Sequence, residues 1–334
     1  MKTAITILMY LISIGLLTAQ ESSIEKFMKE VQELENNKKY TEALELIDLN
    51  LEKFSDYEFR LLKEKIYLNE KMDHYAENLP IFEYAHEKGY FFLLHPDIPK
   101  YKPYRVFPEF EEISERDLKI REQVNAESKT TYKVHLPKDF TGEKRWPLLL
   151  IFHGGGSNLD RVKKHWHSET LKSGYIKVYL QSYNHYDTET YGWRSGDNMA
   201  DIELFRIFIE VIKQYPVDYE KIILAGISAG ATYAIDVAIR NVIPAHGVIA
   251  LCPGIPKDLP AIESNKNSNP AVKVYMIGGE EDYYLPKQLE MAEIFTKSGR
   301  KFRHEVINKM GHQYPDNEDS IVSISMPFFF EKLN

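Results

Sequence analysis

The stretch Lys221-Ile-Ile-Leu-Ala-Gly-Ile-Ser-Ala-Gly230 decides the fold of this chain. An apolar run that ends in Gly-x-Ser-x-Gly predicts a buried strand and then a sharp turn that carries Ser228. The two flanking glycines suit such a turn, because side chains there would collide. Glycine and serine are also common in ordinary turns, which is the simpler interpretation of the motif taken alone. Apolar residues at helical spacing then predict a helix after the turn: Ala231, Ile235, Ala238 and Ile239.

A glycine run follows another predicted strand upstream. Residues Trp146–Phe152 are almost all apolar and lead into His153-Gly-Gly-Gly156. Bare backbone N–H groups in such a loop can converge on an oxyanion as it develops, so Gly154 and Gly155 are candidate donors together with Ala229, the residue after the serine. His153 opens this loop, and we expect it to anchor the loop by a hydrogen bond rather than to act as a base.

Two later segments supply an acid and a base. The predicted strand Val272–Ile277 runs into Gly-Gly-Glu-Glu-Asp, which offers Glu280, Glu281 and Asp282, and His312 stands further on in Gly-His-Gln-Tyr-Pro. A serine hydroxyl is a poor nucleophile at neutral pH, so a base must remove its proton as it attacks a carbonyl. An acid would hold the imidazole of that base in the useful tautomer and stabilise its cation.

The part of the chain from about Thr131 onward resembles the α/β-hydrolase superfamily, in which the order along the chain is Ser, acid, His. It is most similar to small esterases of the dienelactone-hydrolase, phospholipase/carboxylesterase and feruloyl-esterase-like groups. The resemblance implies a mostly parallel sheet with helices on both faces. It also implies a triad of Ser228, Asp282 and His312, because the acid of the family follows the glycines and precedes a short turn.

An aromatic loop and an amphipathic helix follow in the middle of the domain. Loops after parallel strands gather where ligands bind, so Tyr191 and Trp193 in the loop Gln181–Asp197 are candidate substrate-binding residues. The alternative is that Trp193 only packs the loop onto the sheet. The next helix should bury one apolar stripe as a crossover helix, and the stripe consists of Ile202, Phe205, Phe208, Ile209 and Ile212.

Composition excludes several other classes of function. The net charge of −8 argues against nucleic acid as a partner, since phosphate contacts need a basic face. Neither a Gly-x-Gly-x-x-Gly fingerprint after an early strand nor a phosphate-binding loop of the Walker type occurs, so no nucleotide cofactor is expected. Neither His-Glu-x-x-His nor paired cysteine spacing occurs, so no metal is expected. Cys252 is the single cysteine, and we expect a buried, inert thiol there.

The beginning of the chain reads as a leader followed by helices. Residues 1–19 have a lysine, a short apolar stretch and Thr-Ala before Gln20, as a cleaved export signal does, so we expect a periplasmic or secreted protein without a stable membrane anchor. Residues 22–90 predict helices whose pattern recurs after some thirty-five residues and resembles tetratricopeptide repeats. We expect this region to pack against the hydrolase domain, with binding of a protein partner as the alternative.

The remaining segments complete the predicted domain organisation. Residues 91–128 are rich in proline and aromatic side chains and read as a linker wrapping the surface, and residues 129–334 form the catalytic domain. The sequence therefore predicts an exported serine esterase that acts on a small-molecule carboxylic ester through an acyl-enzyme and needs no cofactor. The alternatives are a serine peptidase of the same fold and a non-catalytic helical-repeat adaptor with a vestigial hydrolase domain.

Overall fold

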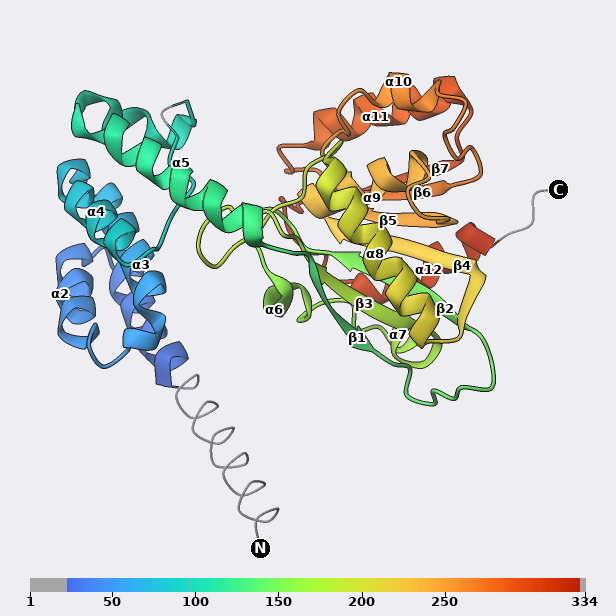
Figure 1. The fold of residues 1–334 in the computed structure, drawn as a ribbon, viewed down its shortest axis with the longest axis horizontal. Coiled ribbons are helices and arrows are strands. Elements are labelled where there is room, and N and C mark those ends of the chain that lie inside the picture. The colour runs from blue at the N-terminus through green and yellow to red at the C-terminus, as the bar shows by residue number, and fades with distance from the viewer. Residues whose placement is uncertain (1–22, 96, 331–334) are drawn as a thin grey trace, which may run out of the picture. The chain divides into compact units, whose positions relative to one another are not determined.

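The computed structural model describes residues 23–95 and 97–330, so the expected leader at 1–19 lies outside the described part. The chain divides into two compact units, with the boundary between Glu122 and Gln123. The first unit is helical, and the second contains a sheet with helices (Figure 1). The predicted α/β fold with a preceding helical region is confirmed. Within the described ranges, no helix is long and apolar enough to cross a lipid bilayer.

The second unit is built on a seven-stranded sheet in the order β1-β3-β2-β4-β5-β6-β7. Strand β1 is antiparallel to β3, and every other pairing is parallel. The strands are β1 (Thr131–His135), β2 (Trp146–Phe152), β3 (Ile176–Gln181), β4 (Val217–Ile227), β5 (Gly247–Leu251), β6 (Lys273–Gly279) and β7 (Phe302–Ile307). Strands β2 and β4 are neighbours, with Phe152 opposite Gly226, so the glycine loop and Ser228 leave the sheet side by side.

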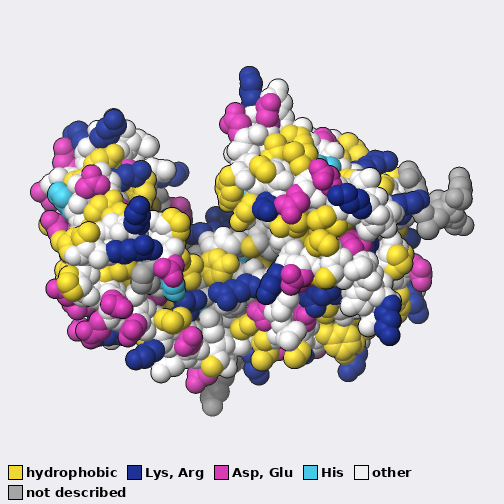
Figure 2. Space-filling model, turned by 90° about the horizontal axis from the view of Figure 1, so that it is seen from above, with side chains coloured by type: hydrophobic (Ala, Val, Ile, Leu, Met, Phe, Trp, Pro, Cys, Tyr) yellow, Lys and Arg dark blue, Asp and Glu magenta, His cyan; other side chains and the backbone are white. Residues whose placement is uncertain are grey.

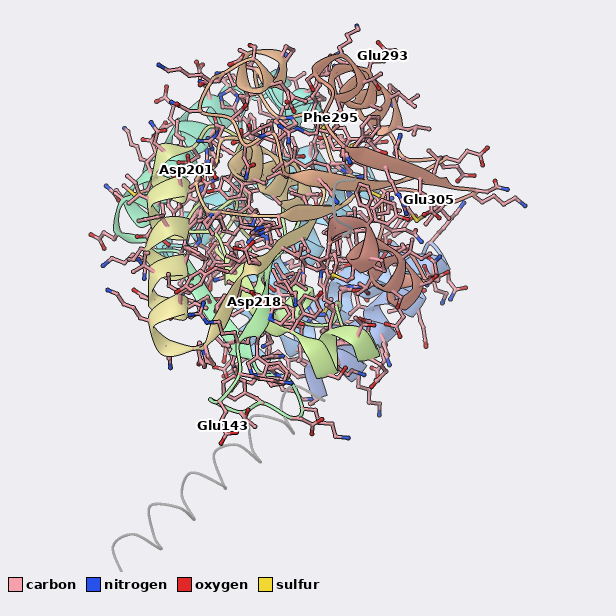
Figure 3. All side chains as sticks on the ribbon, turned by 90° about the vertical axis from the view of Figure 1, so that its right-hand side faces the viewer. Glu143, Asp201, Asp218, Glu293, Phe295 and Glu305 are labelled. Atoms are coloured by element: carbon pink, nitrogen blue, oxygen red, sulfur yellow. The ribbon has the colours of Figure 1, made fainter. Side chains whose placement is uncertain are left out.

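Helices cover both faces of this sheet (Figures 1 and 3). Successive side chains of a strand point to opposite faces; accordingly Leu150 joins one buried cluster and Ile151 the other. Side chains of α8, α9 and α11 pack on the first face, and those of α7 and α12 pack on the second. The helices are α6 (Leu159–Val162), α7 (Glu169–Gly174), α8 (Asn198–Gln214), α9 (Ala229–Ile239), α10 (Leu259–Glu263), α11 (Leu285–Ser298) and α12 (Glu318–Phe330). In Figure 3, Asp201 marks α8 and Phe295 marks α11.

Helix α8 forms where the sequence predicts it, but the predicted apolar stripe is partly wrong. Ile202 and Phe205 are 62% and 49% exposed, whereas Leu204, Ile207 and Val211 are fully buried. The side chain of Asp197 caps the helix by accepting hydrogen bonds from the N–H groups at its start. Both faces of α8 carry apolar residues, so spacing alone did not decide which one packs on the sheet.

The first unit consists of helices around two apolar clusters. Residues 23–36 are helical, and they are followed by α2 (Tyr40–Asn50), η1 (Ser55–Tyr57), α3 (Glu58–Lys71), η2 (Tyr75–Asn78), α4 (Leu79–Glu87), η3 (Pro99–Val106) and α5 (Glu109–Glu127). The first cluster includes Ile24, Ile47 and Leu61, and the second includes Ile66 and Phe82. Figure 2 shows a group of Asp and Glu side chains on the surface of this unit.

Residues 91–128 are not a linker wrapping the surface, so that prediction is wrong. They contain η3 and α5, and the side chains of Phe92, Tyr104 and Phe110 lie in the second apolar cluster. The buried carboxylate of Asp117 accepts hydrogen bonds from the N–H groups of Phe92, at 2.6 Å, and Leu94, at 3.1 Å. Residues 91–122 thus belong to the first unit, and they add aromatic side chains and a buried acid to its core.

Asn78 is a polar residue inside the first unit. It is fully buried. Its amide donates to the carbonyl of Ile66 at 3.1 Å and to the hydroxyl of Tyr104 at 2.8 Å, and its oxygen accepts from Asn69 at 2.8 Å. A buried amide is tolerated when it is satisfied in this way, so Asn78 connects η2, α3 and η3 inside the unit.

Candidate active site

Ser228 lies at a strained turn between β4 and α9. Its backbone has φ 54° and ψ −124°, a conformation that non-glycine residues rarely adopt. The glycines on either side are required sterically: a Cβ on Gly226 would lie 2.8 Å from the carbonyl carbon of Gly230, and one on Gly230 would lie 2.2 Å from the carbonyl oxygen of His153. The turn therefore exposes the serine side chain at the carboxyl edge of the sheet, as the motif predicts.

The glycine loop lies directly against this turn. A Cβ on Gly154 would be 3.8 Å from Cβ of Ser228, and one on Gly155 would be 3.5 Å from Cβ of Ala229. Ala229 begins α9, where backbone N–H groups have no acceptor within the helix. The structure thus brings Gly154, Gly155 and Ala229 together around Ser228.

The side chain of His153 holds the glycine loop in place by hydrogen bonds. Its Nδ1 donates to the carbonyl of Gly154 at 2.7 Å, and its Nε2 accepts from the N–H of Ser182 at 3.2 Å. The ring is fully buried, and burial lowers the pKa of His153 to about 4. A neutral imidazole with one donor and one acceptor fits both contacts. The predicted anchoring role of His153 is confirmed.

Asp282 and His312 meet on the other side of the serine. The Nδ1 of His312 donates to Oδ1 of Asp282 at 2.8 Å. Burial works against the charge of Asp282, but hydrogen bonds from the N–H of Tyr284, from His312 and from Cys252 outweigh it and leave the pKa of Asp282 below its ordinary value. Asp282 is therefore ionised beside the imidazole. Glu280 and Glu281, the other candidate acids, are exposed.

Gln288 is a partner of this pair that sequence reasoning missed. It is fully buried on α11, and its Nε2 donates to Oδ2 of Asp282 at 2.8 Å. Its Oε1 lies 3.3 Å from Nε2 of His304, and it would lie 1.9 Å from a Cβ on Gly278. The glycine at 278 thus makes room for the amide that holds Asp282. No pattern in the sequence marks Gln288, because α11 brings it to the site only through packing on the sheet.

Cys252 borders the same pair. Its Sγ, an oxygen of Asp282 and a nitrogen of His312 all lie within 4.8 Å of one another. Burial raises the pKa of the thiol to about 12, with the charge of Asp282 and a hydrogen bond to it adding to the effect. The thiol is therefore neutral, and its Sγ lies 3.5 Å from the carbonyl oxygen of Gln313, to which it donates. Cys252 is buried, as expected.

A cavity of about 510 Å³ opens over these groups. Ser228, His312, Gly154 and Gly155 all line it. Within the described residues the hydroxyl of Ser228 makes no hydrogen bond, so the structure joins His312 to Asp282 but does not join Ser228 to His312. Aromatic rings form much of the wall: Tyr283 lies 4.4 Å from the His312 ring, and Tyr314 stacks on His165 at 3.4 Å. No motif or spacing in the sequence marks Tyr314 or His165 as lining residues.

A second cavity of about 400 Å³ lies on the far side of Ala229. Trp193 lines it but is otherwise buried, with its ring stacked on Tyr233 at 5.0 Å. Trp193 therefore both packs the loop and borders a cavity. Tyr191 is not among the lining residues of either cavity; its ring lies 4.3 Å from that of His185, within the loop.

Tyr186, which sequence reasoning did not single out, comes nearer to the glycine loop. A Cβ on Gly192 would lie 2.0 Å from its ring, and one on Gly155 would lie 3.7 Å from its hydroxyl oxygen. The two glycines thus let the Tyr186 ring lie flat against the backbone. This contact could not be read from spacing in an irregular loop.

Part of the chain matches a known protein family. Residues 194–328, which include Ser228, Asp282 and His312, match a family described as phospholipase/carboxylesterase. No curated protein matches the sequence. An uncharacterized protein from Bacillus cereus ATCC 10987 has a similar structure over 91% of this chain and 98% of its own, at 19% identity and a TM-score of 0.51.

Two solved structures with esterase titles are similar over a smaller part. A ferulic acid esterase is 19% identical over 60% of this chain and 91% of its own, at a TM-score of 0.48. The Bacillus cereus carboxylesterase is 18% identical over 63% of this chain and 99% of its own, at a TM-score of 0.47. The second unit has the α/β-hydrolase fold, and residues 194–328, less than half of the chain, are similar to the phospholipase/carboxylesterase family.

Proposed function

We propose that this protein is a serine esterase that cleaves small carboxylic esters through an acyl-enzyme. The observation that carries the proposal is the hydrogen bond of 2.8 Å between Asp282 and His312 at the wall of a cavity that Ser228 also lines. The fold alone hosts many functions, so the argument rests on these side chains and the groups around them.

The first chemical step is acylation of Ser228. The Nε2 of His312 takes the proton of the hydroxyl while Oγ attacks the ester carbonyl carbon, and Asp282 stabilises the imidazolium that forms. The negative charge moves to the carbonyl oxygen, which the N–H groups of Gly155 and Ala229 can meet. His312 then gives its proton to the departing alcohol. In the second step, water attacks the carbonyl carbon of the acyl-enzyme while His312 takes its proton, and the carboxylic acid is released as Ser228 is regenerated.

Replacement of the nucleophile tests the proposal. Ser228→Ala should lower kcat on para-nitrophenyl acetate by about four to six orders of magnitude, since removal of a triad member disables the set. Ser173→Ala is the matched control, because Ser173 is exposed on α7 and bonds only to the carbonyl of Glu169. The unmodified protein should also react with a fluorophosphonate probe. Normal ester hydrolysis by Ser228→Ala would refute the mechanism.

The same assays separate the two rival functions. A serine peptidase of this fold would cleave peptide anilides faster than para-nitrophenyl esters. A non-catalytic adaptor would neither turn over esters nor react with the fluorophosphonate probe. The family match to residues 194–328 favours the esterase over both.

We further propose that the protein is exported, because residues 1–19 have the composition of a cleaved leader. The mass of the mature protein tests this: it should lack the leader when the gene is expressed with its own start, and a cytoplasmic, full-length product would contradict it. Partner binding by the helical unit stays a prediction that none of these observations tests.

A further inference from the structure

Two cations line the first cavity, beside the serine. Arg161 and Lys164 are exposed there, at and just after α6. Within the described residues neither side chain forms an ion pair; Arg161 donates to the carbonyl of Gly156 at 3.1 Å. Lys163 of the same segment behaves differently, because its ammonium lies 2.7 Å from the carboxylate of Asp160 and it is not among the lining residues. The two lining cations therefore keep their charge free for a ligand.

The second cavity repeats this arrangement on the other side of Ala229. Arg194, Lys257 and Lys287 line it. Lys287 has a carboxylate partner, Glu290 at 2.8 Å, whereas Arg194 and Lys257 form no ion pair within the described ranges. Both of these are exposed.

The sign of this charge is opposite to that of the whole chain. The sequence has 50 Asp and Glu against 42 Lys and Arg, for a net charge of −8. Neither cavity has an Asp or Glu among its lining residues. A concave surface lined by one sign of charge concentrates the electric field and attracts ligands of the opposite sign. The cations thus flank the reacting centre in an otherwise acidic protein.

We propose that this site takes esters that carry carboxylate groups, which the free cations of the two cavities bind. The inference deepens the proposed esterase function and rests on it. Carboxylates suit these residues because the guanidinium of arginine donates two parallel hydrogen bonds to a carboxylate, and lysine adds a point charge. Ser228 lines the first cavity and the next residue, Ala229, lines the second, so a negative charge on the acyl half and one on the alcohol half would lie in different cavities.

Paired substrates test the inference. The first pair is para-nitrophenyl hexanoate and the mono-para-nitrophenyl ester of hexanedioic acid, which differ by a carboxylate on the acyl half. The second pair is para-acetoxybenzamide and para-acetoxybenzoate, which differ by a carboxylate on the alcohol half. The wild type should show the higher kcat/KM for the charged member of at least one pair. The readout is the ratio of kcat/KM, charged over neutral, which cancels general damage to the catalytic groups.

Charge-removing variants assign the preference to a cavity. The double variant Arg161→Gln/Lys164→Gln should lower the kcat/KM ratio for one substrate pair about tenfold. Arg194→Gln/Lys257→Gln should lower the ratio for the other pair by a similar factor. Each exposed ion pair between the substrate and a cation is expected to raise kcat/KM by up to roughly fivefold. Lys163→Gln is the matched control and should change neither ratio. Raising the salt concentration from about 0.05 to 0.5 M should lower the wild-type ratio as well, because salt screens exposed charges.

The possible outcomes distinguish a failure of this inference from a failure of the proposed esterase function. If the wild type hydrolyses the neutral esters but prefers no charged ester, or if both double variants keep the wild-type ratios, the inference is wrong and the esterase function stands. If none of the four esters is hydrolysed, the proposed function falls and this inference with it. The inference is supported if the kcat/KM ratio falls in the variants of the lining cations but not in Lys163→Gln, and if salt also lowers the wild-type ratio.

Discussion

At the scale of single residues, the position of the Asp282 carboxylate depends on Gln288. The amide donates to Oδ2 at 2.8 Å while His312 bonds to Oδ1 at 2.8 Å, so each oxygen of the carboxylate has its own donor. Hydrogen bonds to a charged group contribute about 1.5–3 kcal/mol each. Gln288 therefore acts as a positioning residue for the imidazole, through Asp282.

Removing that amide should slow the chemistry without weakening substrate binding. Gln288→Met keeps the length of the side chain but loses the donor, so kcat on para-nitrophenyl acetate should fall roughly tenfold or more, with KM little changed. Leu289→Ala, at an exposed neighbour on the same helix, is the control and should keep the wild-type kcat. Wild-type kcat in Gln288→Met, measured on folded protein, would show that Asp282 needs no such support.

The residues that the sequence did predict are those with a local pattern. Gly226 and Gly230 flank Ser228 within five positions, and Asp282 follows its strand directly, so motif and strand together define them. Gln288 has no such pattern, because its contact with Asp282 depends on how α11 packs on β6 and on the absence of a side chain at Gly278. Contacts set by tertiary packing are the ones that spacing could not supply.

At the scale of elements, the same distinction holds. Strands β2 and β4 were predicted because their apolar runs are continuous and end in glycine motifs. The buried face of α8 was mispredicted because Ile202 and Phe205 are apolar yet exposed. Residues 91–128 were mispredicted because their prolines suggested extended chain, whereas Pro103 lies inside the 3-10 helix η3. The composition of these two segments was read correctly. Which of their side chains are buried depends on contacts with residues elsewhere in the chain, which composition does not show.

The packing of α9 on the end of β2 gives a prediction at this scale. In Gly230→Ala the added Cβ would lie 2.2 Å from the carbonyl oxygen of His153, a backbone atom that cannot move aside alone. The turn and the glycine loop must then shift together, which should cost about 1–3 kcal/mol of unfolding free energy or more. Urea unfolding followed by fluorescence measures the loss.

Gly174→Ala is the control for that measurement. Gly174 ends α7, and a Cβ there would meet nothing within 4 Å. This variant should be as stable as the wild type or slightly more so, because alanine restricts the unfolded chain. Equal stability of Gly230→Ala and Gly174→Ala would show that the elbow and the glycine loop are not in tight contact.

At the scale of the whole molecule, α12 closes one face of the sheet and carries a partly buried acid, Glu318, at its start. Ile321 and Val322 of α12 pack into the second apolar cluster of the sheet. Glu318, at the first turn, accepts a hydrogen bond from the N–H of Trp166, and its other oxygen lies 3.6 Å from Nδ1 of His165. Burial raises the pKa of Glu318 to about 7. The attachment of the last helix therefore depends on protonation.

This raised pKa predicts how stability varies with pH. Between its ordinary value of 4.5 and about 7, folded Glu318 holds a proton that the unfolded chain has released, so its contribution is complete below 4.5 and is lost as the pH rises through 7. Glu318→Gln cannot ionise but still accepts from Trp166. The thermal midpoint of the variant should equal that of the wild type near pH 4.5 and should be higher than that of the wild type above neutral pH. Asp316→Asn, at an exposed residue whose charge is not among the causes of the raised pKa, controls for the change in net charge. Parallel midpoint-against-pH curves for Glu318→Gln and the wild type would mean that Glu318 is ionised in the folded protein throughout this range.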